Sequence, residues 1–237
     1  KIRKGWNKMT GTLYGIGVGP GDPELMTLKA VRLIEQCDLV AVPKSGDGEG
    51  VAKQIAQKAV PDFDKKELIE VSMPMTRDPQ VLEQSHQAAA EQIEGYLKEG
   101  KSVAFLTLGD PAIYSTYIYV HKKVQQNGFP VEMVPGVPSF CAVAAKLNVS
   151  LAEAAQPLHI IPASYQGVEE GLEWSGPKIL MKTGRSMKKV KALLDEKGLL
   201  DKAMMVQKCG MEGEEIYPSM RDVDENASYF SVIVVEE

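Results

Sequence analysis

The strongest constraint on the fold is the alternation of short apolar segments with longer segments of helical periodicity. In the first half of the chain, apolar or β-branched runs occur at 12–18, 38–43, 67–72, 102–107 and 130–134. The stretches between these runs repeat apolar residues at helical spacing. Strands that alternate with helices form βαβ units, so this half is predicted to be α/β with a parallel sheet.

The clearest helix is predicted over 79–98. Asp78 and Pro79 suit the N-cap and first-turn positions, and Gly100 stands where a helix commonly ends. One apolar face runs along this segment, through Leu82, Ala89, Ile93 and Leu97.

A second α/β unit is predicted after Phe129. Its strands are expected at 157–162, 177–181, 203–208 and 228–235, with a helix at 186–196. Within the charged stretch 210–226, Glu214–Tyr217 could form a short hairpin arm, which predicts a mixed rather than purely parallel sheet. We therefore expect two α/β domains, 9–128 and 129–237.

Charge and composition exclude several classes of function. The net charge of the 237 residues is −5, and because the first eight residues contribute +4, the remainder carries −9. Nucleic acids are poor partners for such a surface, since their affinity comes from clustered Lys and Arg. Residues 1–8 lack an apolar signal-peptide region and are predicted to be a disordered tail or an expression remnant.

Membrane and metal sites are also not expected. The sequence has no run of 18 apolar residues, so no membrane partner is predicted. The three cysteines and three histidines are scattered without metal-ligand spacing. Sparse, odd-numbered cysteines suit a reducing compartment, here the cytoplasm.

The first glycine-rich loop, Tyr14–Leu25, is not a dinucleotide fingerprint. In a GxGxxG pattern that starts at Gly15 or Gly17, the third glycine would fall on Pro20 or Asp22. No GK[ST] follows, so a P-loop is excluded as well. The glycines either serve a simple chain reversal or allow a ligand or another backbone to come close.

Two further loops follow predicted strands, at 106–117 and 134–142. Asp110 could be a helix N-cap within a simple turn, and Ser139 could be either a cap or a ligand contact. In open α/β sheets, ligands bind at the carboxyl ends of strands. Three such loops at strand ends favour a binding crevice over three unrelated turns.

Taken together, Gly17–Ala30, Gly109–Pro111 and Pro135–Ser139 resemble the tetrapyrrole methylases, and the resemblance extends from Met9 onward. It implies two α/β domains with an active-site trough between them, a homodimer, S-adenosylmethionine as cofactor and a small tetrapyrrole substrate. Segments 42–44, 109–120 and 135–152 are most similar to enzymes that methylate C20 of precorrin-2 or cobalt-factor II in cobalamin biosynthesis.

The family's cofactor contacts, carried over by position, fall mainly on backbone groups of these loops. Pro138 replaces a threonine common in the family, so Ser139 is expected to supply the lost hydrogen bond. Two of the residues, Met181 and Cys209, could equally be core residues. The set is Pro20, Leu108, Gly109, Asp110, Ile113, Pro138, Ser139, Met181 and Cys209.

Methyl transfer from a sulfonium needs orientation and proton removal rather than a protein nucleophile. The candidate bases are Tyr114, Tyr117 and Tyr165, each of which could instead be a packed residue with a structural hydrogen bond. Substrate carboxylates call for cations at loop ends. The candidates for this role are Lys44, Arg77, Lys182, Arg185 and Lys208.

The rival interpretations are a methylase of the same fold acting elsewhere, and a cofactor-binding module without catalysis. The first class includes enzymes for other precorrin positions, diphthine synthases and ribosomal RNA ribose methylases. An acidic body argues against the RNA enzyme. The sequence leaves open whether the substrate already carries cobalt.

Overall fold

The computed structural model describes residues 10–45, 50–165, 167–224 and 227–236. The tail expected over 1–8 lies outside these ranges. The chain divides into two compact units, Lys1–Pro138 and Ser139–Glu237, and each is described by itself.

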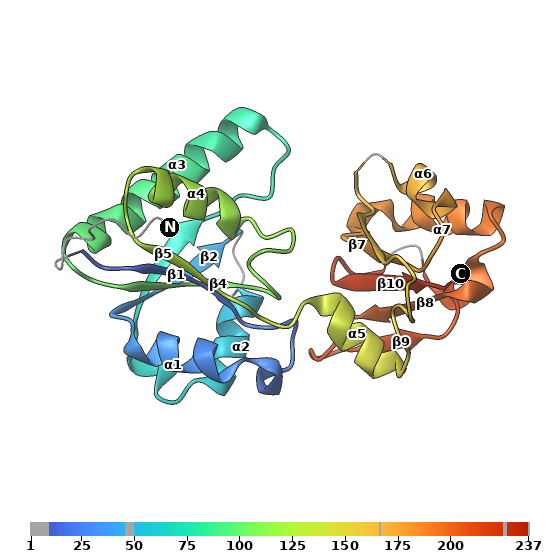
Figure 1. Cartoon of the computed structure of the whole chain (residues 1–237), viewed down its shortest axis with the longest axis horizontal. Helices are drawn as coiled ribbons and strands as arrows, with labels where there is room; N and C mark the ends of the chain where they lie inside the picture. The colour runs from blue at the N-terminus through green and yellow to red at the C-terminus, as the bar shows by residue number, and fades with distance from the viewer. Residues whose placement is uncertain (1–9, 46–49, 166, 225–226, 237) are drawn as a thin grey trace. The chain divides into compact units, whose positions relative to one another are not determined.

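The first unit is built on a five-stranded parallel sheet with the order β3-β2-β4-β1-β5 (Figure 1). Strand β4 is buried at every position and β2 at four of six, as expected for a sheet covered on both faces. The strands are β1 Leu13–Gly17, β2 Leu39–Lys44, β3 Glu67–Ser72, β4 Val103–Thr107 and β5 Val131–Val134.

Two helices cover each face of this sheet (Figure 1). Helices α1 (Leu28–Gln36) and α2 (Val51–Ala59) pack on one face. Helices α3 (Pro79–Lys98) and α4 (Tyr117–Gln126) pack on the other. The prediction for α3 is confirmed, and Asp78 accepts hydrogen bonds from the backbone of Gln80 and Val81.

The order of the strands places a topological switch point between β1 and β4. These two strands are neighbours, yet the chain leaves β1 toward α1 on one face and β4 toward α4 on the other. Loops that depart in opposite directions from adjacent parallel strands leave an opening at the carboxyl edge. The first two glycine-containing loops therefore meet at the topological switch point.

The second unit contains a mixed sheet with the order β6-β7-β10-β8-β9. Strands β6, β7 and β8 run the same way, whereas β10 and β9 run against them, which confirms the mixed sheet and the hairpin arm. The elements are α5 Ser139–Leu147, β6 His159–Pro162, α6 Val168–Glu173, β7 Lys178–Met181, α7 Met187–Glu196, β8 Ala203–Gln207, β9 Glu215–Tyr217 and β10 Ser231–Val235. Single 3-10 turns occur along the chain at Pro23–Leu25, Phe63–Lys65, Gly184–Ser186, Leu200–Lys202 and Met220–Asp222.

The division between the units comes later than the expected boundary at residue 129. Strand β5 pairs with β1, and the Leu13 amide donates to the Pro130 carbonyl at 3.0 Å. Gly128, at φ 89°, and Phe129-Pro130 make only the short turn from α4 into β5. The segment 129–138 therefore belongs to the first unit, and α5 opens the second.

Candidate functional site

Main-chain contacts hold the first two loops together at the carboxyl edge of the parallel sheet. The Gly109 amide donates to the Gly19 carbonyl at 2.8 Å, and the Gly19 amide returns a bond to the Gly109 carbonyl at 3.3 Å. Gly19 and Gly109 have φ values of 77° and 70°, a region that glycine enters without strain. The loops therefore form one short antiparallel bridge.

The third loop packs on the first two without intervening side chains. A Cβ atom at Gly17 would lie 2.6 Å from the Gly136 nitrogen. One at Gly136 would lie 2.2 Å from the Gly109 carbonyl oxygen. The density of glycine in the sequence thus reflects, in the first place, close approach by another backbone.

Asp110 fastens the second loop to the third. One carboxylate oxygen accepts from the Ala112 amide at 2.8 Å, and the other accepts from the Gly136 amide at 3.1 Å. The side chain thus acts as a local cap and also as a tie between loops. These two bonds fix the orientation of Asp110 and of the main chain on either side of it.

The first-unit candidates for cofactor binding lie along these loops. Pro20 and Gly109 are buried, whereas Leu108, Ile113 and Pro138 are half-buried at the same edge. Beneath them, the hydroxyls of Thr107 and Ser115 are 2.7 Å apart and hold the start of the segment that leads to α4.

Tyr117 is ruled out as a base by its position. Its side chain is fully buried in the α3–α4 core and fills the space above Gly15, where a Cβ atom would lie 2.0 Å from the ring. Its hydroxyl lies 3.0 Å from Nδ1 of His121. Burial raises the pKa of Tyr117 far above its usual range, against a weaker opposing effect of the Gly15 backbone. This candidate is therefore a core residue, as the alternative interpretation held.

Tyr114 and Tyr165 are accessible, in contrast to Tyr117. Tyr114 lies in the second loop, is 44% exposed and has a left-handed φ of 50°. Tyr165 follows β6 in the second unit and is 66% exposed. Both hydroxyls could reach a solute.

The second unit gathers polar groups at the carboxyl ends of its three parallel strands. Lys182 follows β7 and Lys208 follows β8, with left-handed φ values of 56° and 52°. Burial lowers the pKa of Lys182. The other candidates at this edge are Met181, which is half-buried, and Cys209, which is buried.

Two residues at this edge gave no signal in the sequence. Tyr229 precedes β10 and is 46% exposed, and a Cβ atom at Gly184 would lie 3.2 Å from its ring. Thr183 is fully buried, and its hydroxyl has no hydrogen-bond partner within the described ranges. Tyr229 reaches this edge from the segment before β10, 45 residues after Gly184 in the sequence.

The remaining cationic candidates are dispersed. Lys44 ends β2 and pairs with Glu70 at 2.8 Å on an exposed surface, and Arg77 is exposed after β3. The side chain of Arg185 lies outside the described part of the structure. Across the described ranges, no cluster of His, Cys, Asp or Glu could hold a metal ion.

The three loops lie within a part of the chain that matches a known protein family. The family model for Tetrapyrrole (Corrin/Porphyrin) Methylases matches residues 12–223. The chain belongs to this family. The match includes all three loops and most of the second unit.

Several relatives of this methylase are about one third identical to it. The probable cobalt-precorrin-2 C(20)-methyltransferase of Methanocaldococcus jannaschii is 33% identical, over 97% of this chain and 98% of its own. The precorrin-2 C(20)-methyltransferase of a Sinorhizobium species is 30% identical over 95% of both chains. Cobalamin biosynthesis protein CobIJ of Mycobacterium tuberculosis is 34% identical, and the chain spans only 46% of its length.

Solved structures support the fold of the methylase. Cobalt precorrin-4 methyltransferase CbiF superimposes with a TM-score of 0.73 at 22% identity, covering 95% of this chain and 94% of that one. Uroporphyrin-III C-methyl transferase from Thermus thermophilus, complexed with S-adenyl homocysteine, gives a TM-score of 0.70 at 19% identity, covering 96% and 92%. In the described ranges, none of the helices has both the length and the apolar character needed to cross a membrane.

Proposed function

We propose that this methylase transfers a methyl group from S-adenosylmethionine to C20 of precorrin-2 or cobalt-factor II in cobalamin biosynthesis. The observation that carries the proposal is the backbone-built pair of loops at the β1–β4 switch point. Relatives named for C20 methylation match nearly the whole chain at 30–33% identity, which supports this position of the ring over others.

The first unit suits a cofactor that is held by main-chain groups. Pro20, Leu108 and Ile113 lie beside the glycine bridge at its edge, so a nucleoside that packs there would meet apolar side chains and main-chain groups. When bound, S-adenosylmethionine supplies an already activated methyl group. The residues proposed to hold it are Pro20, Leu108, Gly109, Asp110, Ile113 and Pro138 in the first unit and Ser139, Met181 and Cys209 in the second.

Lys182 and Lys208 are proposed to bind carboxylates of the tetrapyrrole. Burial disfavours the charged form of Lys182, and a carboxylate placed against it would restore that charge. Tyr165 and Tyr229 add hydroxyls at the same edge of the second sheet. Lys44, Arg77 and Arg185 are further candidates for the same role.

The accepting carbon must lose a proton during the transfer. With Tyr117 enclosed in the core, Tyr114 and Tyr165 are the remaining tyrosines proposed to accept that proton, directly or through water. Their further task is orientation, because correct placement of the two reactants supplies a large part of the acceleration.

Two measurements test the proposed function. Calorimetric titration with S-adenosylhomocysteine is expected to show binding at one site per chain, and absence of binding would reject the methyltransferase assignment. Incubation with methyl-labelled cofactor and either precorrin-2 or cobalt-factor II should then give a product labelled at C20. Label at another carbon would assign a different precorrin position, and comparison of the two substrates decides the metal state.

The same proposal includes a homodimer in the cytoplasm that acts on a small molecule rather than on nucleic acid or membrane. Family resemblance supports the dimer, and the net charge of −5 disfavours a polyanionic partner. Light scattering after size exclusion is expected to give twice the chain mass of 25.9 kDa. A monomer at micromolar concentration would remove this part of the proposal.

A further inference from the structure

The loop that follows β8, residues 208–214, is folded back on itself by its own main chain. Lys208, Gly210 and Gly213 all have left-handed φ values, of 52°, 73° and 76°. The Met211 amide donates to the Lys208 carbonyl at 2.8 Å, and the Glu214 amide donates to the Met211 carbonyl at 3.2 Å. Two successive turns thus bring Glu214 back toward the end of β8.

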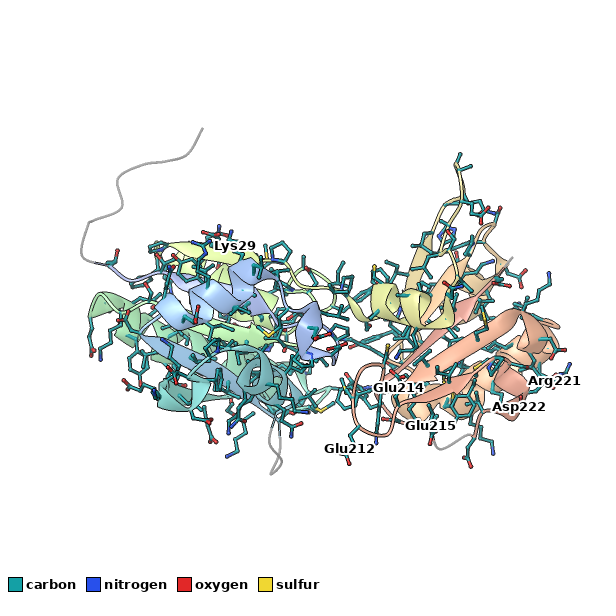
Figure 2. All side chains as sticks on the ribbon, turned by 90° about the horizontal axis from the view of Figure 1, so that it is seen from below. Lys29, Glu212, Glu214, Glu215, Arg221 and Asp222 are labelled. Atoms are coloured by element: carbon teal, nitrogen blue, oxygen red, sulfur yellow. The ribbon has the colours of Figure 1, made fainter. Side chains whose placement is uncertain are left out.

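The carboxylate of Glu214 closes this loop and also binds a helix. Oε2 accepts from the Gly210 amide at 2.7 Å, while Oε1 lies 2.9 Å from the ammonium group of Lys146 on α5. Figure 2 labels Glu214 with its neighbours Glu212 and Glu215 on this segment of the second unit. The side chain of Glu214 is 23% exposed and that of Lys146 is 42% exposed, so the carboxylate is the more shielded of the two groups.

The ionised form of Glu214 is the form that these contacts favour. Its pKa is lowered, first by the Gly210 amide and then by Lys146, with burial acting in the opposite direction. Hydrogen bonds to an ionised acceptor are stronger than those between neutral groups. The carboxylate is therefore a fixed charge that joins two segments of one unit.

Both segments carry candidate cofactor contacts. Gly210 directly follows Cys209, so the bond to its amide orients the peptide group between these two residues. Lys146 lies seven residues, or about two helical turns, after Ser139 on α5. Because Ser139 and Lys146 belong to the same helix, the ion pair connects α5 to the loop at the end of β8.

We propose that Glu214 is a positioning residue for the cofactor, which sets the main chain at Cys209 relative to Ser139 without touching the ligand. This inference rests on the proposed function. Glu214 acts through the Gly210 amide and through Lys146, and its replacement is expected to weaken cofactor binding more than methyl transfer itself.

The test compares variants by calorimetric titration with S-adenosylhomocysteine, well below each variant's unfolding temperature. Glu214→Ala removes both contacts and should raise Kd roughly tenfold. Glu214→Gln keeps an oxygen for the Gly210 amide and loses the ion pair, so a smaller increase is expected. Lys146→Met should raise Kd about two- to fivefold. Lys146→Arg keeps the positive charge and should leave Kd near the wild-type value.

Kinetics and a neighbouring control distinguish positioning from a general loss of structure. In Glu214→Ala, KM for S-adenosylmethionine should rise while kcat changes less than about twofold. Glu212→Gln alters an exposed residue of the same loop and should leave both constants unchanged. If Glu214→Ala fails to fold, the Lys146 pair of variants and Glu214→Gln decide the question.

The outcomes separate this inference from the proposed function. Wild-type protein that does not bind S-adenosylhomocysteine overturns both. Wild-type protein that binds, with unchanged Kd in Glu214→Ala and Lys146→Met, overturns the role of Glu214 alone. A fall in unfolding temperature with no change in Kd or KM would likewise show a merely structural residue.

Discussion

Glycine occupies positions 17 and 136 because main-chain atoms of neighbouring loops lie where a side chain would begin. The atoms concerned belong to backbone, which cannot rotate away as a flexible side chain can. At the residue scale, the candidate site therefore depends on the absence of side chains as much as on the groups that are present.

Gly17→Ala should destabilise the protein by about 1–3 kcal/mol, as overpacked substitutions do, and should abolish measurable binding of S-adenosylhomocysteine. The control is Gly95→Ala, an exposed position in α3 with no atom within 4 Å of the added Cβ. That change should stabilise by about 0.5–1 kcal/mol through helix propensity. Urea unfolding and calorimetry measure both variants, and wild-type behaviour of Gly17→Ala would contradict the packing described.

Thr183→Val should raise the free energy of unfolding by about 1 kcal/mol, because it replaces a buried hydroxyl that lacks a described partner with a methyl group of similar shape. Thr107→Val makes the same chemical change where the hydroxyl bonds Ser115, and should lower stability by a similar amount. If urea unfolding showed that both substitutions lower the free energy of unfolding equally, the Thr183 hydroxyl would have a hydrogen-bond partner in solution.

Helices α3 and α4 illustrate how packing between elements determines the behaviour of individual groups. His86 of α3 stacks on Tyr119 of α4 with ring centroids 4.7 Å apart, and is only 6% exposed. Lys123 of α4 also pairs with Glu83 of α3. At the element scale, His86 is therefore part of the contact between α3 and α4.

Stability should fall as pH drops below about 6.5. Burial lowers the pKa of His86 from its ordinary 6.5, so the unfolded chain takes up a proton more readily than the folded one. The contribution of His86 to the free energy of unfolding is therefore complete above the pKa that this residue has in the unfolded chain, and it is lost as pH falls below that value. His86→Phe keeps an aromatic ring that can stack on Tyr119 but removes the group that binds the proton.

Urea unfolding between pH 7.5 and 5 should show a shallower pH slope for His86→Phe than for the wild type. Some slope should remain, because burial also lowers the pKa of His121. An identical slope in the two proteins would mean that His86 titrates normally in the folded state.

Over the whole molecule, elements were easier to predict than the contacts between them. Strand and helix positions followed from periodicity, and the three loops followed from their spacing, because both depend on residues close together in sequence. The unit boundary did not, since only the pairing of β5 with β1 shows where 129–138 belongs. The sequence left Tyr117 open between a base and a packed residue for the same reason, because its ring packs on Gly15, a hundred residues away.

A fragment comparison tests the position of that boundary. A fragment of residues 10–138 retains β5 and should unfold cooperatively, whereas a fragment of 10–128 should aggregate, because it exposes the edge of β1. Circular dichroism and light scattering would follow both. Cooperative unfolding of 10–128 would place the boundary back at residue 129.

The outer strands of the sheets have one further consequence. Glutamates lie exposed on three of them, at Glu67 and Glu70 of β3, Glu132 of β5 and Glu215 of β9. Glu70 pairs with Lys44 and Glu132 pairs with Lys29, and charged side chains of either sign on an outer strand oppose its pairing with the strand edge of another molecule. Joining two such edges would remove these charges from water, so light scattering should show no strand-to-strand aggregates of the folded protein at neutral pH.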